Sequence, residues 1–157
     1  MVSLNLDRID KRILELMQAN GRISNLELAE QDGLSPTPCS RRVKRLEESG
    51  LITGHVTLLD PQALGLNLTA IVGIAMDRHT PDRFESFEKA ISSMPEIIEC
   101  SIVTGQKADF LLKVVVRDMQ HYEQFLLGNL TRLDGVTGVH SSFVLRNLVK
   151  KTALPLD

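Results

Sequence analysis

The sequence SNLELAEQDGLSPTPCSRRVKRLEESG, residues 24–50, contains two helix starts separated by a short turn. Ser24 and Glu27 have the spacing of a capping box, in which each side chain accepts a hydrogen bond from a backbone N–H of the other residue. Gly33 favours the left-handed conformation in which many helices end. Ser35 is expected to cap a second helix, with Pro36 at its first position, where a missing N–H does no harm. The segment therefore predicts two helices joined by a turn of three residues.

The second predicted helix has an apolar side and a basic side. At about 100° per residue, the small and apolar residues fall within one narrow arc: Cys39, Val43, Leu46 and Gly50. The opposite side presents Thr37, Arg41, Lys44 and Arg45. On charge alone, a solvated helix face is an equally good interpretation. The capping and turn pattern favours a helix-turn-helix, whose second helix enters the major groove of DNA.

Guanidinium groups bind phosphates and guanine edges, and short hydroxyl side chains near a helix start can reach bases or phosphates. We expect Thr37, Ser40, Arg41 and Arg45 to supply most groove contacts, and Arg42 and Lys44 to bind phosphates. The full set of expected DNA-binding residues is Asn25, Ser35, Thr37, Pro38, Ser40, Arg41, Arg42, Lys44 and Arg45.

The charge is concentrated rather than high. The whole chain has a formal net charge of −2, and residues 1–53 contain equal numbers of basic and acidic side chains. Four of the basic residues, however, fall within residues 41–45, so the positive field is local to the second helix. This distribution predicts specific binding rather than a general coating of DNA.

Length and composition exclude several classes of protein. A chain of 157 residues with 43% hydrophobic residues can form two small domains. Its apolar runs are too short to span a bilayer and the first residues lack a signal-peptide core, so a cytoplasmic location is expected. Cys39 and Cys100 are too few for a disulfide framework or a zinc site, and both are expected in the core. No metal or cofactor is expected.

The four histidines lie in unrelated predicted elements, without a nucleophile beside a base or a pair at metal-ligand spacing. They are His55, His79, His121 and His140. The sequence therefore predicts a protein that is not an enzyme.

The rest of the chain completes an α+β arrangement. An amphipathic helix over 7–21 adds the third helix of a helix-turn-helix domain (1–53), and residues 51–59 predict a short strand or wing. The connection (54–66) contains Pro61, and residues 67–157 form the second domain. Its predicted elements are a strand at 66–76, a helix at 81–94, strands at 97–104 and 108–117, a helix at 119–133 and a strand at 136–149. This order is the ferredoxin-like βαββαβ fold, with both helices on one face of an antiparallel sheet.

The other face of that sheet is expected to expose Ile71 and Val115. A second copy of the same sheet would cover these residues and give a two-fold dimer. Such a dimer could hold two recognition helices roughly 34 Å apart, at successive major grooves of a pseudo-palindromic site.

Four stretches resemble the Lrp/AsnC family of leucine-responsive, or feast/famine, transcriptional regulators. They are LDRIDKRILELMQANGRIS (6–24), LSPTPCSRRVKRLEESGLITG (34–54), ADFLLKV (108–114) and KTALPL (151–156). The resemblance covers nearly the whole chain. It implies an N-terminal DNA-binding domain and a C-terminal domain that dimerises, assembles further, commonly to an octamer, and binds an amino-acid effector between dimers.

The resemblance places the effector at the loop between the second and third strands of that domain. The family loop reads Gly, two variable residues, Asp and an aromatic residue, whereas this loop, 105–110, is one residue longer. N–H groups near Gly105 can bind a carboxylate, and Asp109 can pair with an ammonium group. An ordinary hairpin, with Asp109 bonded to turn amides, is the alternative. The expected effector-binding residues are Thr104, Gly105, Gln106, Lys107, Ala108, Asp109, Phe110, His140 and Ser141.

The sequence thus predicts a transcriptional regulator that responds to an amino acid, with leucine or methionine as first candidates. Two alternatives remain at this point. One is an architectural DNA-binding protein without effector control, and the other, by analogy with haem-pathway proteins of the same architecture, is a decarboxylase-like enzyme.

Overall fold

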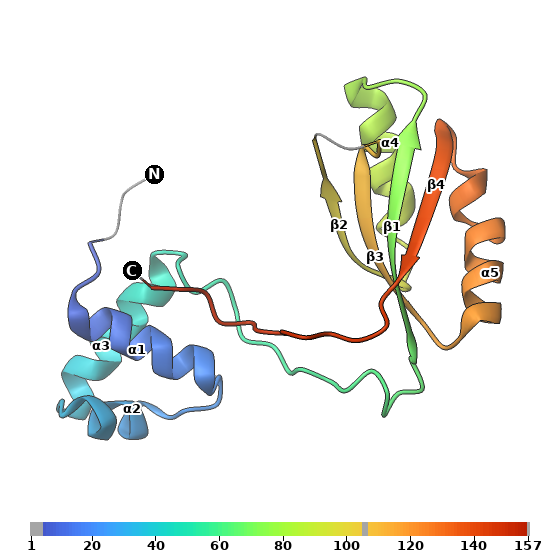
Figure 1. Ribbon diagram of the computed structural model, residues 1–157. Helices are drawn as coiled ribbons and strands as arrows, with labels where there is room; N and C mark the ends of the chain where they lie inside the picture. The colour runs from blue at the N-terminus through green and yellow to red at the C-terminus, as the bar shows by residue number, and fades with distance from the viewer. Residues whose placement is uncertain (1–4, 105–106, 157) are drawn as a thin grey trace. The chain divides into compact units, whose positions relative to one another are not determined.

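The computed structural model describes residues 5–104 and 107–156 and divides into two compact units (Figure 1). The N-terminal unit comprises residues 1–58 and 149–157, and the C-terminal unit comprises residues 59–148. The predicted division kept all residues from 67 to 157 in one domain. The structure instead returns the last residues of the chain to the N-terminal unit.

Three helices form the N-terminal unit: α1 (Arg8–Ala19), α2 (Asn25–Asp32) and α3 (Pro36–Glu48). Asp7 and Asp10 form a capping box at the start of α1, because the Asp10 N–H donates to Asp7 (2.8 Å) and the Asp7 N–H donates to Asp10 (3.1 Å). The helices enclose a core of Ile13, Leu14, Leu28, Ala29, Cys39, Val43 and Leu46. The predicted inner side of α3 is therefore confirmed for its three apolar residues, whereas Gly50 is exposed.

The start of α2 follows the prediction and the start of α3 departs from it. Ser24 and Glu27 form both bonds of the capping box, and Gly33 ends α2 in the left-handed conformation with φ 63°. Ser35 occupies the cap position of α3, but its side chain makes no capping hydrogen bond. Pro38 explains this difference, because it occupies the third helical position and lacks the N–H that a cap side chain usually binds.

The predicted strand or wing over 51–59 is wrong. Residues 51–60 form no strand in the structure, and Val56 and Leu58 are 85% and 70% exposed. A β-strand needs a neighbouring strand for its backbone hydrogen bonds. No such neighbour lies beside this segment within the described residues, so its β-forming side chains alone do not make it a strand.

The C-terminal unit contains a four-stranded antiparallel sheet in the order β2-β3-β1-β4 (Figure 1). Its elements are β1 (Leu68–Met76), α4 (Pro81–Ile91), β2 (Ile97–Ile102), β3 (Phe110–Val116), α5 (Met119–Gly128), the short helix η1 (Leu130–Arg132) and β4 (Val136–Phe143). This arrangement confirms the ferredoxin-like fold and the α+β class. β4 ends six residues earlier than predicted: Phe143 pairs with Ala70, the Val144 N–H donates to the Thr69 carbonyl (2.9 Å), and β1 itself begins at Leu68.

Both helices pack on one face of this sheet. Alternate residues of β1, among them Val72 and Ile74, share a buried core with Phe87 of α4 and with Tyr122 of α5. On the opposite face Ile71 is half-buried. Val115 was expected to be exposed but is buried within the single chain.

The two cysteines differ. Cys39 lies in the core of the N-terminal unit, whereas Cys100 is exposed on β2, at the edge of the sheet, so the prediction of a core position was wrong for Cys100. Desolvation by neighbouring atoms raises the pKa of both thiols above the ordinary value, including that of Cys100, which is partly covered although the residue as a whole is exposed. In the described part of the chain no helix has the length and apolarity needed to cross a membrane, and no group of side chains there could hold a metal ion.

The end of the chain is attached to α1. The side-chain amide of Gln18 donates to the Leu154 carbonyl (3.1 Å) and accepts a hydrogen bond from the Leu154 N–H (2.6 Å). Leu156 packs against the core of the N-terminal unit. These contacts explain why residues 149–157 belong to this unit.

Candidate functional site

The outer side of α3 is polar and accessible. The packing of Cys39, Val43 and Leu46 against the core turns Thr37, Ser40, Arg41 and Lys44 toward solvent. Lys44 lies 3.7 Å from Glu48 in an exposed pair. Arg41 forms no ion pair with any residue that the structure describes. Asn25 and Ser35, at the starts of α2 and α3, are also exposed, and Pro38 is half-buried.

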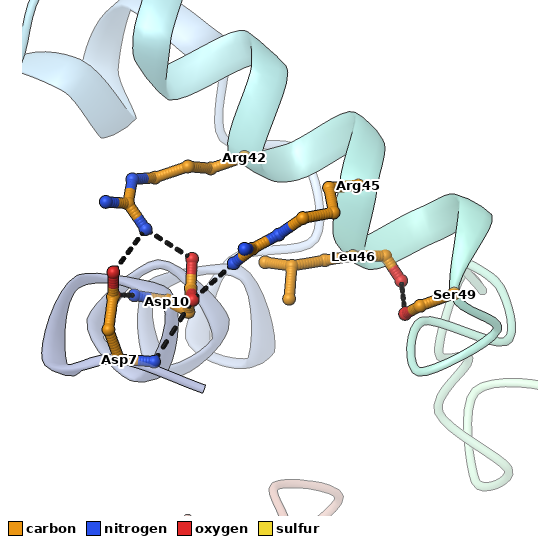
Figure 2. Close-up of polar contacts among 6 residues, drawn as sticks. All are labelled: Asp7, Asp10, Arg42, Arg45, Leu46 and Ser49. Atoms are coloured by element: carbon orange, nitrogen blue, oxygen red, sulfur yellow. Dashed lines mark hydrogen bonds and ion pairs between the residues drawn. The ribbon is translucent and has the colours of Figure 1, made fainter. Parts of the chain in front are cut away.

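Two of the four cations of α3 face α1 instead (Figure 2). Arg42 Nη1 donates to Asp7 Oδ2 at 2.7 Å and to Asp10 Oδ1 at 2.8 Å, and Arg45 Nη2 donates to Asp10 Oδ2. The Asp10 side chain is 1% exposed, against 27% for Arg42 and 50% for Arg45. Arg42 and Arg45 were both expected to contact DNA, and the structure shows that each is also bonded within the protein.

Hydrogen bonds and charge stabilise the ionised forms in this cluster. The Asp10 N–H, followed by the Arg42 guanidinium, lowers the pKa of Asp7 below its ordinary value. Hydrogen bonds to Asp7 and Asp10 raise the pKa of Arg42. The Arg42 guanidinium therefore stays charged, and it lies on the edge of α3 nearest α1.

A shallow hollow of about 320 Å³ lies over this edge, lined by Asp7, Pro38, Arg41, Arg42 and Arg45. Three guanidinium groups meet there, which suits a phosphate or the edge of a base. Sequence reasoning missed the contribution of Asp7 and Asp10. Two acids at i and i+3 in the first helix were the only signal, and their partners lie more than 30 residues away.

The predicted effector loop is only partly described by the structure. Gly105 and Gln106 lie outside the described residues, while Thr104 and Lys107 are exposed. Asp109 is held by several bonds: its N–H donates to the Ile74 carbonyl (2.7 Å) and its Oδ2 accepts the Met76 N–H (2.7 Å). Its Oδ1 lies 2.7 Å from His79 Nε2. The Asp109 carboxylate is thus bonded to one backbone amide at the end of β1 and to His79, and both interpretations of its role stay predictions.

The remaining effector candidates lie on different sides of the sheet. Phe110 is buried on the helix side, where its ring stacks on Phe87. The Ser141 hydroxyl bonds to the Tyr122 hydroxyl of α5, so Ser141 also faces the helices. Its neighbour His140 points to the other face because side chains alternate along a strand. The structure therefore does not bring Phe110 and Ser141 together with His140.

His140 does lie near two residues of the loop. It lines a hollow of about 410 Å³ on the helix-free face of the sheet, together with Ile71, Gly73, Lys107, Ala108, Leu111 and Ser142. The floor of this hollow is mainly apolar, and Lys107 and His140 add basic groups. Gly73 leaves space in this hollow, because a Cβ at this position would lie 3.1 Å from the Ala108 Cβ.

Both parts of the chain match known protein families. Residues 6–53 match the winged helix-turn-helix DNA-binding family, and residues 69–154 match the Lrp/AsnC ligand binding domain. The leucine-responsive regulatory protein of Escherichia coli (strain K12) is 44% identical over 150 residues, which cover 96% of this chain and 91% of that protein.

Solved structures agree along the whole chain. A transcriptional regulator from Neisseria meningitidis, determined as a complex with L-methionine, is 38% identical with a TM-score of 0.93, and the match covers 98% of each chain. AsnC of E. coli is 27% identical with a TM-score of 0.87, and the match covers 97% of this chain and 100% of that one. Because both units match and one relative is 44% identical along nearly the whole length, the chain belongs to the Lrp/AsnC family of DNA-binding transcriptional regulators.

Proposed function

We propose that this regulator responds to a small apolar amino acid, with methionine and leucine as the first candidates. The observation that supports this most strongly is the likeness to the N. meningitidis regulator, which was determined with L-methionine and matches 98% of this chain. The relatives at 44% identity are named leucine-responsive. An unbranched or branched aliphatic side chain suits the apolar residues around the loop before β3.

The proposed effector site is the loop 104–109 together with His140, without Phe110 and Ser141, which face the helices. The exposed ammonium of Lys107 and the imidazole of His140 are candidates for the effector carboxylate, and Ile71 and Leu111 offer apolar contact. Asp109 is the candidate for the effector ammonium group. Since its Oδ1 is paired with His79, an ammonium group would take the place of His79 on that oxygen.

Calorimetric titration with L-methionine and L-leucine tests this proposal. We expect Asp109→Ala to abolish binding while the C-terminal unit stays folded, because the Met76 N–H loses an acceptor only at the end of β1. Thermal unfolding of the wild type against the twenty amino acids is the first screen, since a ligand that binds only the folded state raises the unfolding temperature. Unaltered binding by the folded Asp109→Ala variant would contradict the role given to Asp109.

For the DNA site, we propose that the exposed residues of α3, namely Thr37, Ser40 and Arg41, make groove contacts. Lys44 contacts phosphates, whereas Arg42 and Arg45, which are bonded to α1, contribute only the parts of their side chains that are exposed. Asn25, Ser35 and Pro38 flank this face. The exposure of these side chains supports the assignment.

We also propose a homodimer that covers the helix-free face of the sheet and assembles further, with an octamer as the expected size. The apolar hollow around Ile71 and Leu111 supports this assembly, because apolar surface favours association. Sedimentation velocity over a range of concentrations tests it. A protein that stays monomeric at micromolar concentrations would contradict it.

An effector-independent architectural protein is the alternative within the family. It would bind DNA with the same affinity and the same assembly state whether or not an amino acid is present. The relatives compared here are regulators by name, so we infer a regulatory rather than a catalytic role, and a cytoplasmic location where the chromosome is accessible.

A further inference from the structure

Asp10 is the charged side chain with the lowest exposure among the described residues, at 1%. A buried carboxylate is strongly unfavourable unless it is paired and hydrogen-bonded. Both oxygens of Asp10 are occupied: Oδ1 accepts from Arg42, and Oδ2 accepts from Arg45 and from the Asp7 N–H. The partners that compensate its charge thus come mainly from the DNA-binding helix.

Arg42 and Arg45 are three residues apart in α3, so they lie on the same side of the helix. Figure 2 shows both guanidinium groups directed at Asp7 and Asp10, at the start of α1. In the part of the chain that the structure describes, one nitrogen of each guanidinium is bonded, Nη1 of Arg42 and Nη2 of Arg45. The remaining N–H groups have fixed positions, whereas a released arginine can reach any nearby phosphate.

We propose that Asp10, assisted by Asp7, is a positioning residue for DNA specificity: by holding Arg42 and Arg45 against α1, it limits their sequence-independent contacts with phosphates. Contacts with phosphates make binding salt-dependent and carry no sequence information, whereas contacts with base edges do. Holding two of the four cations of α3 therefore raises the ratio of specific to non-specific affinity.

The test compares Asp10→Asn with Glu15→Gln in the full-length protein. Both variants remove one negative charge from α1, but Glu15 pairs with Arg12 and not with α3. Binding is measured at several salt concentrations to a random-sequence duplex and to a duplex selected from a random library by the wild-type protein. For Asp10→Asn we expect the log–log salt slope on the random duplex to steepen by up to about 1.8 per protomer, since each new phosphate contact adds about 0.9.

The same variant should show a lower ratio of affinity for the selected duplex to affinity for the random duplex. Asp7→Asn supplies a second, milder variant: asparagine still caps α1, and Arg42 loses only its bond to Asp7. Its slope should steepen by less than that of Asp10→Asn, and it decides the question if Asp10→Asn does not fold. Salt slopes and ratios equal to those of Glu15→Gln would overturn the proposal. A weaker but equally salt-dependent binding to both duplexes would assign Asp10 to stability alone and would overturn it as well.

Discussion

Residues of the same type on one helix have different surroundings in this protein. Arg41 is exposed, and within the described chain it has no ion pair, whereas Arg42 is bonded to two carboxylates only one position further. The net charge of the segment does not distinguish them. Their roles in DNA binding therefore follow from the side of α3 that each occupies.

Replacing Arg41 with alanine should weaken binding to the selected duplex by about 1–3 kcal/mol if it makes a bidentate base contact. Because Arg41 is exposed and contributes nothing to the core, the unfolding temperature should stay unchanged. Fluorescence anisotropy with labelled duplex measures the affinity, and footprinting reports the site. An unchanged affinity and footprint would count against the assignment of α3 as the recognition helix.

Single residues were predictable where the signal was local. Ser24 and Glu27 bond within one turn of each other, Gly33 ends the same helix, and the structure confirms all three. The pairs that join Asp10 to Arg42 and Arg45 span more than 30 residues and depend on how α1 packs against α3. Residue spacing contains no information on such contacts. Ser141 and His140, by contrast, lie on opposite sides of the sheet because adjacent residues of a strand alternate, which is a local effect.

At the scale of the element, the start of α2 should give the N-terminal unit an acid-sensitive contribution to its stability. Hydrogen bonds from the Ser24 N–H and hydroxyl, both 2.8 Å, lower the pKa of Glu27 from 4.5. A lowered pKa in the folded state means that the stabilisation is fully present above pH 4.5 and is lost as the pH falls through the folded value.

Urea unfolding of the wild type and of Glu27→Gln, between pH 6 and pH 3, measures this contribution. Glutamine keeps an oxygen that can accept from Ser24 but has no titrating group. We expect the two free energies of unfolding to converge as the pH falls, because protonation of Glu27 removes the advantage of the wild type. The titration of Asp7 is common to both proteins and cancels in the comparison. Parallel curves across this range would show that Glu27 contributes no pH-dependent stability.

Elements defined by their own sequence were predicted well, and elements that depend on a neighbour were not. The helix α2 begins at the capping box that the sequence displays. The strand β4 ends at Phe143, where its pairing with β1 stops at Ala70, because β1 extends only two residues further, to Leu68, although residues 144–149 include further β-formers. Residues 51–60 also have the composition of a strand. They form none, because the described chain offers them no partner strand.

At the scale of the whole molecule, the N-terminal unit is built from both ends of the chain. We expect deletion of residues 149–157 to destabilise this unit. Loss of the two hydrogen bonds between Gln18 and Leu154 should lower the free energy of unfolding by about 1–3 kcal/mol. Loss of the packing of Leu156 adds to this effect. Hydrogen exchange resolves the effect by unit: amides of α1 should exchange faster, while those of β1 stay protected.

Gln18→Ala is the matched variant for this deletion. It removes both hydrogen bonds but leaves Leu156 in place, so its effect should be smaller than that of the deletion. Equal exchange of the α1 amides in the wild type and in the deletion variant would show that the end of the chain adds nothing to the N-terminal unit.

The attachment of Leu154 and Leu156 to α1 also sets an order of events during synthesis. The three helices emerge from the ribosome first, yet their last packing contacts come from residues made only after every strand of the sheet. A nascent chain that has exposed α3 therefore still lacks part of its support. The DNA-binding unit therefore reaches its full conformational stability only after the ligand-binding unit has been translated.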